Sequence, residues 1–119
     1  MLRLLALAGM AALLLGAAPL AQTPELAQDD SIEVLRTRAN AGDAAAQYTL
    51  GVMYGTGEGV PQDDVEAYKW LNLAAIYADA EQRERFAERR DLAAARLTPE
   101  QRAEGQKRVS EWFAAHPRE

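Results

Sequence analysis

The chain has 119 residues, the size of one small domain, and a formal net charge of −5. The acidic excess disfavours nucleic acid as a partner, because phosphates need a basic surface, and it disfavours electrostatic docking on an anionic membrane. The sequence contains no cysteine, which excludes disulfides and a lipid anchor on cysteine, so stability must come from helix packing or association.

The first 21 residues have the layout of a secretory signal peptide. Arg3 gives the basic start, an apolar run extends from Leu4 to Leu15, and small residues precede a cleavage expected after Ala21. The alternative is a membrane anchor, but the run is shorter than the roughly 20 residues that a spanning helix needs. We therefore expect a periplasmic or secreted protein. Loss of Arg3 would move its net charge from −5 to −6.

Residues 22–30 are polar and acidic, and they are expected to form a flexible arm before a domain at residues 31–117. Capping residues predict the first three helices of this domain. Asp30 and Glu33 make a capping box, Asp43 caps the second helix, and Asp63 or Asp64 caps the third. The apolar faces of the second and third helices consist of Ala46, Gln47, Leu50, Gly51 and Tyr54, and of Ala67, Trp70, Leu71, Ala74, Ala75 and Ala78. Small residues on both faces predict two closely packed antiparallel helices.

A glycine-rich turn is predicted between these two helices. Gly55, Gly57 and Gly59 lie within five positions, and Pro61 follows. Glycine can adopt the positive φ that other residues avoid, and proline lacks the N–H that a helix interior needs. We therefore expect a tight, shaped turn in which Gly59 has a positive φ, and we expect Trp70 to lie between the two helices.

Two further helices are predicted at about residues 80–115. Asp79 with Gln82 forms a capping box for one helix, and Thr98 with Gln101 forms another, with Pro99 at the first helical position. A stack of helical repeats exposes its apolar end unless something covers it. We interpret residues 80–115 as a closing helical hairpin with that role.

These residues resemble a Sel1-like repeat, a helix-turn-helix unit of the tetratricopeptide-like helical-repeat superfamily. The resemblance covers about residues 43–78 and is carried by Gly42, Ala46, Gln47, Leu50, Gly51, Tyr54, Gly57, Gly59, Val60, Asp63, Ala67, Trp70, Ala74 and Ala75. The LTPEQ start and the tryptophan in the last helix are similar to the tails of short bacterial Sel1-like proteins. The resemblance implies an all-α short α-solenoid that serves as a scaffold for protein–protein contacts.

Candidate catalytic and metal-binding residues are few. His116 is the single histidine, and Ser31 and Ser110 lack a visible activating base. Without cysteine or a second histidine, a zinc site would have only carboxylates. The adjacent acidic pairs Asp29–Asp30 and Asp63–Asp64 are better explained as helix caps than as acid and base catalysts. We expect no catalytic residue, no cofactor and no metal site.

Two more patterns have ordinary structural explanations. The spaced glycines superficially resemble a phosphate-binding loop, but they lack the P-loop lysine and do not follow a strand. The arginines of the fourth helix alternate with acidic residues, which indicates a solvated mixed-charge face. These arginines are Arg83, Arg85, Arg89 and Arg90.

Tyr48, Tyr68 and Tyr77 lie beside the signature positions and not on them. Tyrosine is enriched at interface hot spots, so these three are the candidate partner-binding residues; the alternative is that they pack on neighbouring helices. The sequence thus predicts a non-enzymatic scaffold that binds a protein or peptide on the face of the first repeat helix. The alternatives are a cell-envelope enzyme or enzyme regulator that uses carboxylates, and a self-associating homo-oligomer. A deep cleft with converging acidic side chains would favour the enzyme.

Overall fold

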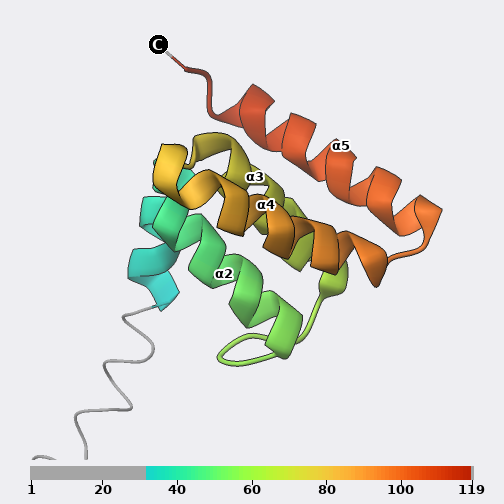
Figure 1. Cartoon of the computed structure of the whole chain (residues 1–119). Coiled ribbons are helices and arrows are strands. Elements are labelled where there is room, and N and C mark those ends of the chain that lie inside the picture. Colours follow the sequence, from blue (N-terminus) through green and yellow to red (C-terminus); the bar gives the residue numbers. More distant parts are fainter. Residues whose placement is uncertain (1–31, 119) are drawn as a thin grey trace, which may run out of the picture. The chain divides into compact units, whose positions relative to one another are not determined.

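The structure, a computed structural model, describes residues 32–118, of which those from Glu33 onward form one unit. This part of the chain contains five helices and no strand (Figure 1). They are a helix at residues 32–40, α2 (Ala44–Thr56), α3 (Asp64–Tyr77), α4 (Ala80–Ala95) and α5 (Pro99–Ala115). The predicted all-α fold is confirmed. The predicted signal peptide, the acidic arm and the cap at Asp30 lie outside the described residues.

Each of the four labelled helices begins at a predicted N-cap. The side chains of Asp43, Asp63 and Asp79 accept hydrogen bonds from backbone N–H groups of the following turn at 2.8–3.3 Å. The third helix is therefore capped by the first of its two candidate aspartates. At α5 the capping box is complete, because Thr98 Oγ1 accepts from Gln101 N and Gln101 Oε1 accepts from Thr98 N. Such caps satisfy N–H groups that have no partner within the helix.

The turn between α2 and α3 is shaped by two left-handed glycines. Gly57 ends α2 and Gly59 follows, both with φ of 78°, so the prediction for Gly59 is confirmed. Gly55 differs from the prediction, because it is still helical and lies in the last turn of α2. It faces α3, and a Cβ placed there would lie 3.7 Å from the Cβ of Ala67, an ordinary van der Waals contact.

Glycine also sets how closely α2 approaches α3 one turn earlier. A Cβ on Gly51 would lie 2.6 Å from Leu71 Cγ and 3.2 Å from the Leu71 backbone nitrogen. The first distance is too short for a real Cβ contact, and the second requires the backbone of α3 to shift by a few tenths of an ångström. The close antiparallel contact predicted from the small residues is therefore confirmed.

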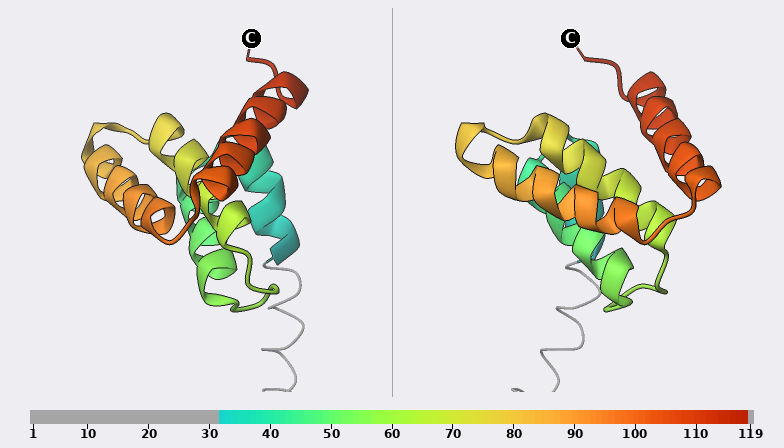
Figure 2. Two further views of the ribbon diagram at one scale, coloured as in Figure 1. Left: turned by 90° about the vertical axis from the view of Figure 1, so that its right-hand side faces the viewer. Right: turned by 45° about the vertical axis from the view of Figure 1, so that its right-hand side comes forward.

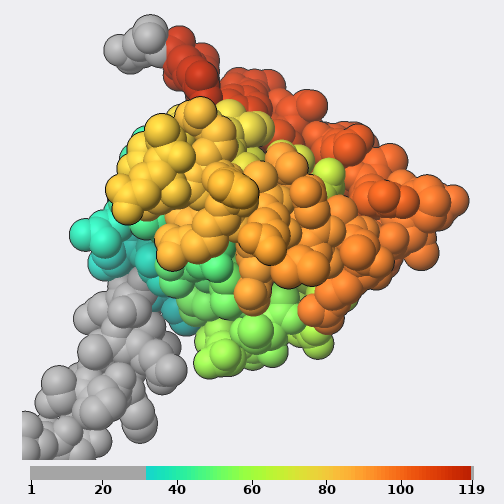
Figure 3. Space-filling model, viewed as in Figure 1, coloured from blue at the N-terminus to red at the C-terminus, as the bar shows by residue number. Residues whose placement is uncertain are grey.

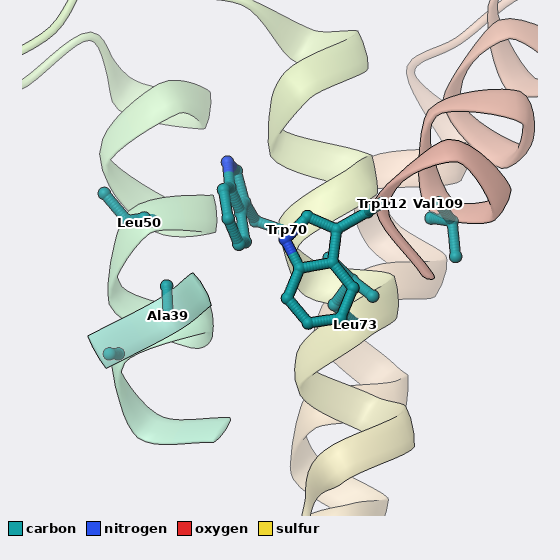
Figure 4. Packing of buried hydrophobic residues seen from close by; sticks show 7 residues of the cluster. Ala39, Leu50, Trp70, Leu73, Val109 and Trp112 are labelled. Atoms are coloured by element: carbon teal, nitrogen blue, oxygen red, sulfur yellow. The ribbon is translucent and has the colours of Figure 1, made fainter. Parts of the chain in front are cut away.

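The buried residues form two clusters on two sides of α3. The first joins the helix at 32–40, α2, α3 and α5, and it contains Ala39, Ala46, Leu50, Trp70, Leu73, Val109 and Trp112 (Figure 4). The second joins α2, α3 and α4, and it contains Ala44, Ala74, Ala75, Ala78 and Phe86. Trp70 is 6% exposed and extends from α3 towards Leu50 of α2, as predicted for the residue between the two helices (Figure 4).

The two closing helices are present where the sequence predicts them, but they do not pack mainly on each other. Both α4 and α5 pack on α3, and they diverge from the short connection that joins them (Figure 2). The reason lies in their apolar residues. Phe86 of α4 enters the second cluster, whereas Val109 and Trp112 of α5 enter the first. Each helix therefore covers a different side of the repeat.

Among the residues that the structure describes, no helix is both long enough and apolar enough to cross a membrane.

Candidate partner-binding groove

A pocket of about 230 Å³ lies where α2 and α4 flank the N-terminal half of α3. We call it the α2–α4 groove. Its lining residues are Gly51, Val52, Gly55, Thr56, Asp64, Ala67, Leu71, Arg89, Leu92, Ala93 and Arg96. In Figure 3 the surfaces of the two flanking helices lie side by side on the face towards the viewer. Ligand pockets for drug-sized molecules usually span roughly 300–1,000 Å³, so this one suits a single side chain better than a whole small molecule.

The α2 wall and the floor of the groove carry no charge except at one end. Helix α2 contains no Asp, Glu, Lys or Arg. Its side of the groove consists of Val52, Thr56 and the glycines Gly51 and Gly55. Ala67 and Leu71 of α3 form the floor, and Asp64 lies at the start of that helix. The glycines allow α2 to lie close to α3, and the nearly buried side chains of Ala67 and Leu71 form an apolar bottom to the groove.

The α4 wall is basic. Arg85, Arg89, Leu92 and Arg96 are spaced by four, three and four residues, so they share one side of the helix and its end. Three of them line the pocket, and Leu92 is 59% exposed on its rim. The acidic residues Glu84, Glu88 and Asp91 border a separate surface hollow on α4. Leu92 lines both this hollow and the groove, so the acidic and basic surfaces of α4 adjoin at that residue.

The arginines of this wall differ in their partners. Arg96 forms an ion pair with Asp64, with 3.4 Å between Nη2 and Oδ1. Arg85 lies over the rings of Tyr48 and Phe86, 5.7 and 5.3 Å from their centroids, without an acidic partner among the described residues. Arg89 is exposed and forms no ion pair within the same part of the chain. Within residues 32–118, the guanidinium groups of Arg85 and Arg89 therefore have no carboxylate partner.

The family comparison matches the element that forms the α2 wall and the floor. A family model described as Sel1 repeat matches residues 44–76. This stretch is a Sel1 repeat. Repeats of this kind generally mediate protein–protein contacts. No curated protein and no solved structure matches the chain.

The Sel1 repeat covers α2 and nearly all of α3, whereas α4 and α5 follow it. The predicted repeat at about residues 43–78 is thus confirmed as a Sel1-like unit. The basic wall of the groove comes from outside the repeat. It is a feature of this chain's closing helices.

The three candidate tyrosines pack within the molecule, which is the alternative weighed from the sequence. Tyr48 stacks on Phe86 of α4, with 4.5 Å between ring centroids. Tyr68 is 6% exposed and faces Gly105 of α5, where a Cβ would lie 2.5 Å from the ring, so it offers little surface to a partner. Tyr77 lies edge-on to Trp112 at 5.8 Å and stacks on Phe113.

These contacts do not bring the three tyrosines together. Tyr48 belongs to the α2–α4 side, and Tyr77 belongs to the α5 side. A partner role for them stays a prediction, and Tyr48 is the one next to the basic wall.

The sequence does not identify Val52, Leu92 and Arg96 as residues of the groove. It predicts Arg85 and Arg89 as part of a solvated mixed-charge face, whereas the structure places them on the basic wall. The arginines of α4 were interpreted together as one mixed face. In the structure Arg83 instead donates to the carbonyl of Ala78, and Arg90 pairs with Asp91. The spacing of 85, 89, 92 and 96 was visible in the sequence. Only the packing of Phe86 showed which side of α4 faces the groove.

A charged cluster on the opposite side has a structural role. Glu66 of α3 accepts from Lys69 at 2.9 Å and from Arg108 of α5 at 2.7 Å. Hydrogen bonds from Arg108 to Glu104, and then to Glu66, raise the pKa of the arginine against the lowering effect of its burial. The pair between Arg108 and Glu66 therefore holds a fully charged guanidinium across the contact between α3 and α5.

His116 is half-buried just after the end of α5. Its ring stacks on Trp112 with 4.2 Å between centroids, and Nδ1 lies 2.8 Å from the Trp112 carbonyl oxygen. Ser110 is exposed, and Ser31 lies outside the described residues. Within residues 32–118, no group of three or more His, Asp or Glu side chains is placed to hold a metal ion.

Proposed function

We propose that this protein is an exported, non-enzymatic interaction module that binds a protein or peptide partner in the α2–α4 groove. The observation that supports the proposal most directly is the pocket itself. It has an apolar floor from the Sel1 repeat, an uncharged wall and a basic wall, where Arg89 has no ion pair with any residue that the structure describes. Apolar pockets with a few convergent polar groups are the usual form of a binding site.

The groove also bears on the rival enzyme hypothesis. Among residues 32–118, Asp64 is the only acidic residue that lines the pocket, and its partner is Arg96. Division of general acid and general base roles needs two carboxylates in one site. The chemistry of this pocket therefore favours recognition over catalysis.

Export is proposed from the sequence of residues 1–21, with the periplasm as the expected location. The test is to sequence the N-terminus of the protein recovered from a periplasmic fraction, and the expected start is near Gln22. Recovery of the intact Met1 form from the cytosol alone would refute this part of the proposal.

Binding through the groove is tested by two matched substitutions of exposed apolar residues. Leu92→Glu changes a rim residue that is 59% exposed, and Val34→Glu changes a residue that is 50% exposed on the helix at 32–40 and does not line the pocket. Because both side chains are exposed, neither change should cost more than about 0.5 kcal/mol of stability. Partner capture from an envelope extract should be lost with Leu92→Glu and kept with Val34→Glu.

The same experiment separates the alternatives. A partner retained equally by both variants would exclude the groove as the docking site. If the protein instead captures only its own copies and runs as an oligomer in light scattering, the self-association alternative holds.

A further inference from the structure

The proposed function does not state the chemistry of the partner. The charges around the α2–α4 groove indicate which kind of peptide can bind there. The chain as a whole carries −5, yet Arg85, Arg89 and Arg96 line or adjoin this groove against Asp64 alone. We infer that the groove takes an acidic peptide segment, in which one apolar side chain enters the pocket and the neighbouring carboxylates lie towards Arg89 and Arg85. This inference rests on the proposed function and specifies its ligand.

The apolar part of the recognition follows from the floor. Ala67 and Leu71 are 2% and 3% exposed, so their side chains are fixed by the core below them. Leu92 extends the apolar surface at the rim, where it is 59% exposed. A space of about 230 Å³ against these residues accommodates one aliphatic or aromatic side chain of a bound segment.

The charged part follows from the two arginines that have no acidic partner in the described part of the chain. Arg85 and Arg89 are one helical turn apart, a rise of about 6 Å along α4, which is close to the spacing of alternate residues in an extended peptide. A guanidinium group binds a carboxylate through two parallel N–H···O bonds. Because Arg96 is already paired with Asp64, the first two arginines would bind the carboxylates of the ligand.

The same observations disfavour a nucleic acid or an anionic membrane as the occupant. The basic side of α4 extends over only about 16 Å from Arg85 to Arg96. Exposed Glu84, Glu88 and Asp91 lie on the same helix and would repel an extended polyanion. A short acidic peptide carries fewer charges for these carboxylates to repel.

The test uses a peptide library with a fixed central leucine and randomised flanking positions, applied to the whole chain as purified. Asp and Glu should be enriched at the positions beside the leucine, and Lys and Arg should be depleted. The double variant Arg85→Gln with Arg89→Gln should remove this selection. For an acidic peptide from the selected pool, it should weaken binding by roughly three- to thirty-fold.

Arg102→Gln is the matched control, because Arg102 is an exposed residue of α5 that forms no ion pair within the described residues. It should leave both the selection and the affinity unchanged. Thermal unfolding of each variant shows whether the fold is retained. Binding by the parent should weaken as salt increases, and binding by the double variant should respond much less.

The outcomes separate the inference from the proposed function. Peptides retained without an acidic preference, but released by Leu92→Glu, would overturn the acidic-ligand inference and leave the groove as a binding site. An acidic preference that survives the double arginine variant would also overturn the inference, because other residues would then bind the carboxylates. If no peptide is retained above the Leu92→Glu background, the inference fails, and partner capture decides the proposed function by itself.

Discussion

Alanine substitution at two glycines of the same helix should change the free energy of unfolding in opposite directions. Gly51 and Gly55 are both helical residues of α2, one turn apart, and both face α3. In a helix, replacing glycine by alanine gains about 0.5–1 kcal/mol, because alanine has less backbone freedom to lose. That gain is common to both positions, so the surroundings of the new Cβ decide the sign.

At Gly51 the new Cβ would lie 2.6 Å from Leu71 Cγ, 2.8 Å from Leu71 Cδ2 and 3.2 Å from the Leu71 backbone nitrogen. Movement of one side chain does not relieve all three contacts, so the helices must separate. Overpacking of this kind costs about 1–3 kcal/mol, and Gly51→Ala should therefore lower the free energy of unfolding by about 1–2 kcal/mol net.

At Gly55 the nearest atom to the new Cβ would be the Cβ of Ala67 at 3.7 Å, an ordinary van der Waals contact. Gly55→Ala should therefore keep most of the helical gain and stabilise the protein by up to about 1 kcal/mol. It serves as the matched control, because the two variants have the same composition and differ only in position.

Urea denaturation followed by far-UV circular dichroism measures both changes. With a dependence of about 1 kcal/mol per molar urea, the midpoint should fall by about 1 M or more for Gly51→Ala and rise by somewhat less than 1 M for Gly55→Ala. Equal stabilisation by both substitutions would refute the close approach of α2 and α3 at Gly51 and with it the geometry of the groove floor.

Three further perturbations test other parts of the fold. Trp70→Ala removes a side chain that is 6% exposed and should lower the free energy of unfolding by about 3–5 kcal/mol, a large share of the roughly 5–10 kcal/mol available to a small domain. If the variant unfolds, by circular dichroism, at the same denaturant concentration as the parent, Trp70 is not a core residue. Gly59→Val should cost about 1–2 kcal/mol by chemical denaturation because φ is 78°, and an unchanged midpoint would contradict the left-handed turn. Arg108→Ala removes the 2.7 Å ion pair with Glu66 and should lower the free energy of unfolding by less than about 1 kcal/mol. Because salt screens the pair, the thermal midpoint of the variant should approach that of the parent at high salt. A difference between the two midpoints that salt does not reduce would show that packing, and not charge, holds α5 on α3.

The local structure of this protein was largely accessible from the sequence, because caps and turns depend on residues close along the chain. Asp43, Asp79 and Thr98 were identified as caps from their identity and the residues that follow them, and the structure places each at a helix start. Gly59 was assigned its positive φ from the glycine density. The burial of Trp70 followed from helical spacing on one face.

The sequence was less informative where a residue has more than one physical use. The spacing groups Gly55 with the turn glycines, yet it is helical, and a Cβ there would make only an ordinary contact with Ala67. Composition alone cannot distinguish a glycine needed for its backbone, such as Gly59, from one needed for its size, such as Gly51. The tyrosines pose the same problem, since an aromatic side chain suits either a neighbouring helix or a partner, and only the contacts of Tyr48 and Tyr77 show the internal packing.

The tertiary structure alone decided how the closing helices are used. Periodicity predicts that α4 and α5 each have an apolar side, but it does not state which surface that side covers. In the structure Phe86 and Trp112 enter different clusters, so α4 and α5 diverge over α3. This orientation turns Arg85 and Arg89 towards α2 and creates the basic wall. Helix spacing fixes which residues share a side, whereas contacts between distant segments fix what that side faces.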